Sequence, residues 1–370
     1  MAMQVMVGEY SSAMKRLVAW LLLVMVACSV VGAIRSDEQV IFFPSFASQT
    51  SNGWRLSIHG WVHEPETRPI LGAILRRAIP IDRDALTDAE RDIYRERTRY
   101  FLPDNERRKV VTVKIGSLER DAPPTASDGH FTLRCDLSPR EFASLPASNG
   151  CLSVAAVLDQ NDSRAFVGSI HVLSNSGWSV ISDIDDTIKV SEVRNREALL
   201  LNTFCRPFKS VDGMADLYRS WHTNGAQFHY FSASPWQLYI PLAEFVAKAG
   251  FPAGTFHMKD FRAKDSRFLA LFSDPEKFKL KLIRPFFEQF PERRFVLVGD
   301  SGEKDPEIYG QIAREFPNQV HTILIRDVTD ENRGSQRYKT AFRNVKEGSW
   351  HVFKSAKELN SIRIGVSSSQ

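Results

Sequence analysis

The stretch WSVISDIDDTIKVS, residues Trp178–Ser191, sets both the fold and the chemistry that this sequence predicts. A short apolar run leads directly into Asp183, Asp185 and Asp186, and Thr187 follows before the chain turns apolar again. Carboxylates this close repel one another, and burying them costs several kcal/mol per ion unless a cation or hydrogen bonds compensate. We therefore expect a strand that ends in a site for a positive ion.

The residues after this stretch alternate between two kinds of segment. Nearly continuous apolar runs are separated by stretches of helical composition; the runs are WSVISDID, AQFHYFSA, RRFVLVGD and QVHTILIR. Strands that alternate with helices indicate a parallel sheet covered on both faces. In such sheets ligands bind beyond the carboxyl ends of the strands, so those ends are where we expect the site.

The first half of the chain has a different pattern. From Val40 to Ser174, short strand-like runs are separated by Gly, Pro, Asn and Asp, which indicates an antiparallel sandwich or barrel. One segment, ALTDAERDIYRERTRYFL, predicts a helical insertion that starts at Thr87 or Asp88. With about 150 residues per domain as a guide, we predict a β-rich domain over residues 40–175, a catalytic domain over 176–355 and a frayed tail over 356–370.

The amino-terminal residues predict a targeting segment over residues 1–35. Lys15 and Arg16 precede an uninterrupted apolar run, Leu17–Ile34, with Val31 and Ala33 placed as in a cleavage site. A signal peptide or an uncleaved signal anchor fits, and either implies a secretory or membrane-associated location. A cytosolic location stays open.

Cysteine content and net charge give weaker constraints. Cys135 and Cys151 flank a loop between two strand-like runs, so either a disulfide or two reduced thiols is expected there. Lysine and arginine total 48 against 44 acidic residues, a net charge of +4. So small an excess does not indicate a nucleic-acid partner.

The expected strand ends bring together groups suited to phosphate chemistry. These groups are Asp183, Asp185 and Thr187 at the first end, Ser232 and Ser234 at the second, Asp300 and Asp305 at the third, and Lys279 or Lys281 on the preceding helix. Magnesium prefers a few carboxylates together with water and substrate oxygens. The sequence therefore predicts a magnesium-dependent phosphate site.

These motifs resemble those of the haloacid dehalogenase superfamily of phosphohydrolases. DIDDT matches the first motif, and Ser232, Lys279 and GDSGEKD match the second, third and fourth in order. The longer strings ISDIDDTIK, HYFSASPWQLY, GDSGEKDPEIYG and GWVHEPE resemble the phosphatidate phosphatase family first associated with actin patches. The resemblance spans Val40–Phe353 and implies a doubly wound parallel sheet behind a sandwich-like domain, and magnesium-dependent conversion of membrane phosphatidate to diacylglycerol. The amino-terminal apolar segment departs from the family.

The resemblance and the residue chemistry together suggest roles, with Thr187 completing the catalytic motif. Asp183 is expected to attack phosphorus, and Asp185 to transfer protons with a pKa raised by crowding. Asp300 is expected to bind magnesium with Asp183 and the main-chain carbonyl of Asp185, while Asp305 orients it or adds a ligand. Ser232 and Lys279 are expected to stabilise phosphoryl charge; Lys281 is the alternative lysine.

These segments also allow other interpretations. The substrate can instead be a soluble phosphomonoester or phosphoprotein, or the fold can serve only lipid binding. GDSG also occurs around the nucleophile of trypsin-like proteases, a reading that needs an activated Ser301. Asp186 and Ser234 are expected to be capping or turn residues. Lys259, Arg262 and Lys264 either contact an anionic lipid surface or lie in a solvated loop. Trp236 and Tyr239 either line an entrance for acyl chains or belong to the hydrophobic core.

Overall fold

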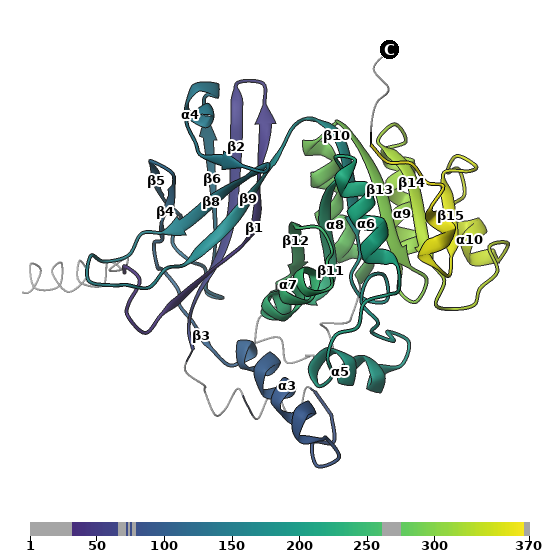
Figure 1. Cartoon of the computed structure of the whole chain (residues 1–370), viewed down its shortest axis with the longest axis horizontal. Helices are drawn as coiled ribbons and strands as arrows, with labels where there is room; N and C mark the ends of the chain where they lie inside the picture. The colour runs from purple at the N-terminus through teal and green to yellow at the C-terminus, as the bar shows by residue number, and fades with distance from the viewer. Residues whose placement is uncertain (1–31, 66–71, 73–74, 76–78, 261–274, 366–370) are drawn as a thin grey trace, which may run out of the picture.

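The described residues form two β-sheets, one mainly antiparallel and one parallel, which lie side by side (Figure 1). This computed structural model describes residues 32–65, 72, 75, 79–260 and 275–365. Most of the predicted targeting segment, and the expected lipid contacts Arg262 and Lys264, lie outside these residues. Within the described part of the chain, no helix is both long enough and apolar enough to cross a bilayer.

The first sheet has nine strands and forms what we call the β-rich region. Its strands are β1 (Gln39–Thr50), β2 (Gly53–Glu64), β3 (Asp104–Asn105), β4 (Thr112–Ile115), β5 (Leu118–Asp121), β6 (His130–Leu137), β7 (Ala147–Ser148), β8 (Cys151–Ala156) and β9 (Val167–Leu173). The order is β3-β2-β1-β9-β8-β4-β5, with β6 beside β2 and β7 beside β8. Every pair is antiparallel except β1 with β9. The predicted antiparallel character is therefore confirmed.

Helices α3 and α4 interrupt the β-rich region within the described residues. Helix α3 (Asp88–Thr98) begins at Thr87, whose hydroxyl accepts the amide of Glu90 while the Glu90 carboxylate accepts the amide of Thr87. This reciprocal cap satisfies two amides that a helix start otherwise leaves unpaired. A 3-10 turn, η1 (Arg99–Phe101), follows α3, and a short α4 (Pro139–Ala143) lies later in the chain. The predicted helical insertion is confirmed, with Thr87 as its cap.

The second sheet has six parallel strands and forms what we call the α/β region. Its strands are β10 (Ser176–Ser182), β11 (Gln227–Pro235), β12 (Gly254–Lys259), β13 (Glu292–Asp300), β14 (Val320–Arg326) and β15 (Trp350–Phe353). Its helices are α5 (Arg196–Phe204), α6 (Met214–Thr223), α7 (Tyr239–Lys248), α8 (Pro275–Gln289), α9 (Asp305–Glu315) and α10 (Gln336–Ala341), with 3-10 turns η2 (Trp236–Leu238) and η4 (Ala356–Leu359).

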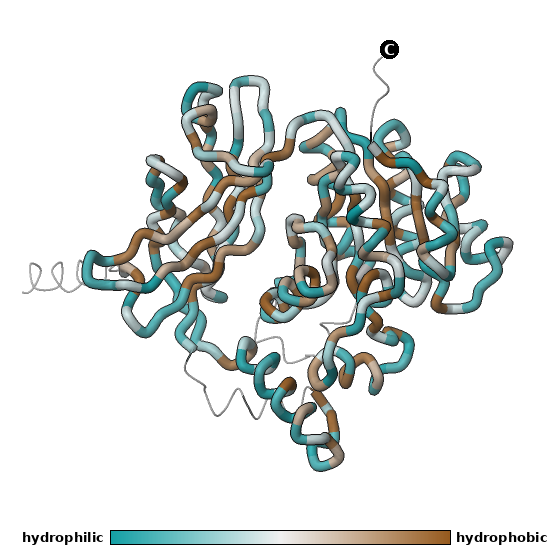
Figure 2. Tube along the Cα trace, viewed as in Figure 1, coloured by the Kyte–Doolittle hydropathy of each residue, from teal (hydrophilic) through white to brown (hydrophobic). Residues whose placement is uncertain are grey.

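Both faces of the parallel sheet are buried. Val180 and Ile181 are adjacent on β10, yet they belong to two different hydrophobic clusters, because successive side chains of a strand point to opposite faces. Figure 2 shows hydrophobic residues along the strands of both sheets, whereas α3 is mostly hydrophilic. The expected mixed α/β fold with a parallel sheet is confirmed.

Strand order decides where a ligand can bind. The order is β12-β11-β10-β13-β14-β15, so the chain steps outward in one direction from β10 and then in the other from β13. Where the direction reverses, neighbouring connections leave opposite faces and open a crevice at the carboxyl ends of the strands. That point lies between Ser182 and Val298, which are paired in register.

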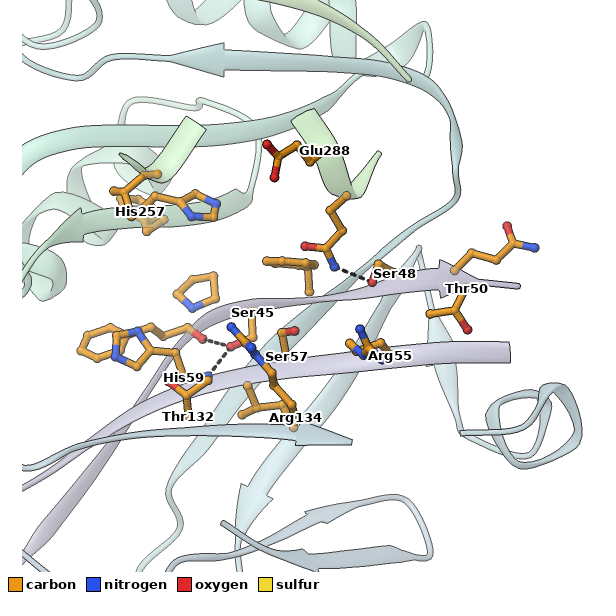
Figure 3. Close-up of a pocket in the computed structure, with 18 of the residues that line it drawn as sticks. Ser45, Ser48, Thr50, Arg55, Ser57, His59, Thr132, Arg134, His257 and Glu288 are labelled. Carbon is orange, nitrogen blue, oxygen red and sulfur yellow. Dashed lines mark hydrogen bonds between the residues drawn. The ribbon is translucent and has the colours of Figure 1, made fainter. Parts of the chain in front are cut away.

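The two regions meet along β1. The Phe43 ring lies 4.2 Å from that of Trp236 and meets Tyr239 edge-on at 5.0 Å, and Gln289 Nε2 donates to Ser48 Oγ at 2.7 Å. Trp236 is buried here, which supports its core reading. A cavity of about 720 Å³ lies in the same interface, with β1, β2 and β6 on one side and β12 and α8 on the other (Figure 3).

The carboxyl-terminal tail is ordered further than predicted. Ser355 caps η4, and Ala356, Leu359 and Ile364 are buried against the α/β region. The expectation of a frayed tail from residue 356 was wrong for residues 356–365, because three apolar side chains at irregular spacing anchor a segment whose composition is otherwise polar. Residues 366–370 lie outside the described part.

The described cysteines are all unpaired. Cys135 and Cys151 are free thiols, and Cys151 Sγ lies 3.5 Å from Nδ1 of His171. Of the two alternatives for this pair, the structure contains the reduced one.

Two buried histidines predict that the fold weakens in acid. Burial, together with nearby His130 for His63 and His222 for His171, lowers the pKa of each to about 4. The unfolded chain takes up these protons near pH 6.5, whereas the folded chain resists until about pH 4, so stability present above pH 6.5 is lost as pH falls. By pH 5 we expect a loss of about 2 kcal/mol per histidine in the free energy of unfolding.

Urea unfolding at pH 7.5 and pH 5 measures this loss. The His171→Gln variant cannot take up the proton, so its stability should fall less between the two pH values than that of the wild type. An equal fall in both proteins would contradict the prediction for His171.

Candidate active site

Three neighbouring strands carry the predicted residues to one edge of the parallel sheet. Asp183 directly follows β10 and its amide donates to Val298 O at 2.9 Å, Ser232 lies near the end of β11, and Asp300 is the last residue of β13. Asp305 begins α9, and Lys279 lies in α8. The sequence prediction of a common strand-end cluster is confirmed as to position.

The centre of this edge is a buried acidic trio. Carboxylate oxygens of Asp183, Asp300 and Asp305 lie within 4.8 Å of one another, and each residue is at most 1% exposed. A fourth acid, Glu303, lies beside them and is 3.3 Å from Lys279 Nζ. Four carboxylates against one lysine leave an excess of negative charge that only protons or a further cation can balance.

Lys279 is that lysine. It is fully buried, and its Nζ donates to Asp183 Oδ1 at 2.7 Å and to Asp305 Oδ1 at 2.6 Å. Burial by itself lowers the pKa of Lys279, but the surrounding carboxylates, Asp183 first among them, raise it well above its usual range. Lys281, the alternative lysine, is exposed. Of the two candidate lysines, the one preferred from the sequence, Lys279, lies in the cluster.

The donor set fits a hard divalent cation. Among the described residues, Asp300 Oδ2 is buried without a hydrogen-bond partner, and Asp183 Oδ2 has only the hydroxyl of Thr187 at 3.3 Å. Burial and the neighbouring acids raise the pKa of Asp300 well above its usual range, and the same holds for Asp183 although Lys279 acts against it. A buried carboxylate oxygen without a protein donor suits a hard divalent cation, because such an ion would offset its charge.

Both carboxylate oxygens of Asp305 accept hydrogen bonds from other residues of the site. Its Oδ1 accepts from Lys279, and its Oδ2 accepts the amide of Asp300 at 3.2 Å. Of the two functions expected for it, orienting the site or adding a ligand, these contacts suit the first.

Asp185 lies next to the trio but outside it. Its carboxylate accepts from Lys189 and Ser191 at 2.7 Å each and from Ser234 at 3.3 Å. Burial acts to raise the pKa of Asp185, yet Lys189 and these hydroxyls outweigh it and lower the pKa. The expectation of a raised pKa was therefore wrong, because the nearest charge is a lysine rather than an aspartate. Its side chain is not among the grouped metal-ligating oxygens, which leaves only its main-chain carbonyl as a candidate ligand.

Asp186 has a structural function. Its carboxylate accepts the amides of Ser191, Glu192 and Val193 at 2.7 to 2.9 Å, and its φ of 52° places it in the left-handed region. It caps the turn that returns the chain toward Asp185, in agreement with the capping reading. The hydroxyl of Ser232 is buried and accepts the amide of Ser234 at 3.0 Å.

The protease reading of GDSG does not fit this geometry. Ser301 is fully buried, and its hydroxyl accepts the amides of Val328 and Thr329 at 2.9 and 3.2 Å. It therefore holds the loop after β14 and has no activating histidine among its contacts in the described residues.

Sequence reasoning did not assign functions to Lys189, Ser191 and Glu303. Lys189 and Ser191 lie inside the opening stretch, and Glu303 lies inside GDSGEKD. A lysine four residues after an aspartate in a turn is a signal for a local ion pair, but only the fold shows that this pair is buried.

Gly299 allows Asp305 to approach β13. A Cβ at position 299 would lie 2.3 Å from Asp305 Oδ2 and 2.6 Å from Asp305 Cβ. We expect Gly299→Ala to displace Asp305 and with it Lys279, lowering kcat about tenfold or more, with a stability loss of about 1–3 kcal/mol. Gly334→Ala, where the nearest atom is an exposed side-chain oxygen at 3.3 Å, is the control. Turnover and urea unfolding of both variants measure the effect, and equal turnover and stability in the two variants would contradict it.

Comparison with known proteins agrees with this site. Residues 178–327 match the family model described as the catalytic domain of phosphatidate phosphatase APP1. This part of the chain is therefore similar to the catalytic domain of an APP1-type phosphatidate phosphatase. The matched residues include the acidic trio, Lys279, Asp185 and Ser232.

Two yeast proteins show the extent of the similarity. Phosphatidate phosphatase APP1 of Saccharomyces cerevisiae is 30% identical over 246 residues, which are 64% of this chain and 41% of that protein. An uncharacterised protein of Schizosaccharomyces pombe is 30% identical over 205 residues, 53% of this chain and 33% of that protein. The chain thus spans less than half the length of either relative.

The similarity to solved structures is weaker than the sequence similarity to these two proteins. A chain of the Pnkp1/Rnl/Hen1 complex covers 50% of this chain and 60% of its own length, with a TM-score of 0.30 and 15% identity. A similarity at that level does not identify a fold.

Proposed function

We propose that this protein is a magnesium-dependent phosphatidate phosphatase that converts phosphatidate in a membrane to diacylglycerol and phosphate. The observation that carries the proposal is the buried trio of Asp183, Asp300 and Asp305 with its unpartnered Asp300 oxygen, beside the buried ammonium of Lys279. The similarity to the catalytic domain of phosphatidate phosphatase APP1 supports the substrate.

The residues suit an in-line displacement in two steps. A carboxylate oxygen of Asp183 attacks phosphorus and the bond from phosphorus to the lipid oxygen breaks. The leaving alkoxide becomes the diacylglycerol hydroxyl by taking a proton from Asp185, which must first bind that proton in the substrate complex because its pKa is lowered in the free site. Asp185 then takes a proton from water as the water oxygen attacks phosphorus, which releases phosphate and restores Asp183. Asp185 lies two residues from Asp183 but bonds to separate partners, so the two carboxylates can divide these tasks.

Three groups suit the charge that develops on the phosphoryl oxygens. Lys279 neutralises charge on Asp183 and the transferring group, and Ser232 offers a buried hydroxyl at the adjacent strand end. Magnesium, when bound, supplies charge neutralisation of the phosphoryl oxygens; Asp183, Asp300 and the main-chain carbonyl of Asp185 would hold it, with Asp305 orienting the set.

The proposal also covers the fold of the two domains and the cellular location of the protein. We infer a haloacid dehalogenase-like catalytic domain over residues 176–355 behind a sandwich-like domain over 40–175. The strand order around β10, the helices on both faces and the order of the motifs support this. The apolar run Leu17–Ile34 supports a secretory or membrane-associated location.

Phosphate release tests the function. Phosphatidate in mixed micelles and a water-soluble alkyl phosphate are offered to the wild type, with and without magnesium, beside Asp183→Asn. Release from the lipid that requires both magnesium and Asp183 is the expected result. Release from the soluble ester alone would replace the lipid by a soluble phosphomonoester, and no release from either would favour a binding module.

A further inference from the structure

The carboxylate of Asp185 depends on one buried lysine. Lys189 is 1% exposed, and its ammonium bonds to Asp185 Oδ1 at 2.7 Å and to the hydroxyl of Ser191, which itself donates to the same oxygen. The direction in which Asp185 points is therefore fixed by the position of Lys189.

The position of Lys189 is fixed in turn by a second stretch of chain. Val190 N donates to Lys209 O at 2.8 Å and Val211 N donates to Ile188 O at 2.9 Å, so residues 188–190 pair with residues 209–211. Beside this pair, the Lys189 ammonium lies 4.9 Å from the centre of the Phe208 ring.

The same ring receives a second cation, which comes from the β-rich region. The guanidinium of Arg97, in the last turn of α3, lies 3.6 Å from the centre of the Phe208 ring. Arg97 is only 6% exposed, and its Nη1 donates to Thr203 O at 2.7 Å and to Asn202 O at 3.3 Å, carbonyls at the end of α5. A cation at a helix carboxyl end satisfies carbonyls that the helix leaves unpaired and interacts favourably with its dipole.

Helices α3 and α5 lie side by side although they belong to different regions (Figure 1). Phe101 of η1 meets Phe204 edge-on at 5.9 Å, and Arg206 Nε donates to Glu90 Oε1 at 3.3 Å. From α3, Arg97 contacts the Phe208 ring, which Lys189 also contacts.

We propose that Arg97 is a positioning residue for Asp185, so that the β-rich region completes the acid–base arrangement of the α/β region; this role rests on the phosphatase function proposed above. Arg97 holds the end of α5 and the Phe208 ring, the ring and the paired stretch hold Lys189, and Lys189 holds Asp185. The β-rich region is then part of the catalytic unit through one buried contact, in addition to any lipid contact it makes.

Stopped-flow kinetics with nitrophenyl phosphate tests this role. Nitrophenolate leaves without needing a proton, so a misplaced Asp185 spares the first step and slows the attack of water in the second. For Arg97→Met we expect a burst of about one nitrophenolate per enzyme at close to the wild-type rate, and then turnover lowered about 10- to 100-fold. Arg95→Met is the matched control, since Arg95 is on the same helix and its side chain is 72% exposed and pairs with Asp92.

The burst amplitude and the steady-state turnover together distinguish a misplaced Asp185 from a poorly folded variant. A variant that is merely less well folded loses burst amplitude in proportion to its turnover, and that result would overturn the proposal, as would equal turnover in Arg97→Met and Arg95→Met. Should Arg97→Met yield no folded protein, Phe208→Leu removes the shared ring and keeps most of its apolar volume. It must then give the same burst and slow turnover.

Hydrogen exchange tests the contact without relying on catalysis. The amides of Val190 and Val211 should exchange about tenfold or more faster in Arg97→Met than in Arg95→Met, because the pairing they report loses its support. Unchanged exchange would overturn the proposal even if the wild type released no phosphate from any substrate. Absence of all phosphate release would instead refute the proposed function.

Discussion

Asp183→Asn is expected to lower turnover by about 10⁴-fold or more, since a carboxamide can neither attack phosphorus nor be regenerated as a leaving carboxylate. The metal-free variant should nevertheless be at least as stable as the wild type. Asp183 is buried among Asp300, Glu303 and Asp305, and its pKa is raised well above its usual range by burial first and by those acids next. Asparagine keeps the shape of the side chain and removes one of the crowded charges.

The sign of the stability effect depends on pH. A raised pKa in the folded state means that the unfolded chain gives up this proton more easily, so the wild type loses stability as pH rises above about 3.8. The advantage of Asp183→Asn in the free energy of unfolding should be on the order of 1 kcal/mol at pH 7 and vanish near pH 4.

Urea unfolding in the presence of a chelator, together with phosphate release, measures both effects. Asp216→Asn is the control, because Asp216 is on the surface of α6 and pairs with Arg219. Turnover near that of the wild type in Asp183→Asn would remove Asp183 from the nucleophile role. A loss of stability at pH 7 as large as the gain expected here would show that the trio is already balanced without a further cation.

Strand-end residues were the part of the site that the sequence predicts well. Asp183, Ser232 and Asp300 each follow an apolar run long enough to be a buried strand, and parallel strands place such residues at one edge whatever the details of packing. Lys279 could be chosen over Lys281 only through its spacing in the family pattern. The fold explains that choice, because in α8 one of the two lysines points into the cluster and the other into solvent.

The contacts that distinguish the environment of Asp185 from that of Asp183 could not be predicted from the sequence. Counting charges in DIDDT predicts repulsion between neighbours, but the turn capped by Asp186 directs Asp185 away from Asp183 and toward Lys189. Long-range contacts were equally hidden, since nothing in the composition of α3 indicates that Arg97 reaches the end of α5. Both depend on tertiary packing rather than on local pattern.

Lys279→Met is expected to impair both stability and turnover, and Lys281→Met neither. Removing the Lys279 ammonium leaves Asp183 and Asp305 buried without their shared cation, and breaking a buried ion pair from one side typically costs about 3–5 kcal/mol. Turnover should fall about 10²- to 10³-fold, because the charge on the transferring group loses a preorganised partner. Lys281 is exposed on the same helix two residues later, so its substitution changes the surface of α8 alone.

Magnesium distinguishes this account from a simple packing defect. If the acids of the trio also bind the metal, magnesium should stabilise Lys279→Met more than it stabilises the wild type, because in the variant the ion offsets charge that Lys279 otherwise offsets. Urea unfolding of both proteins with magnesium and with chelator gives the two differences directly. A variant that is destabilised to the same extent in both conditions would mean that Lys279 supports the fold independently of the metal. Equal stability and turnover in Lys279→Met and Lys281→Met would remove Lys279 from the site altogether.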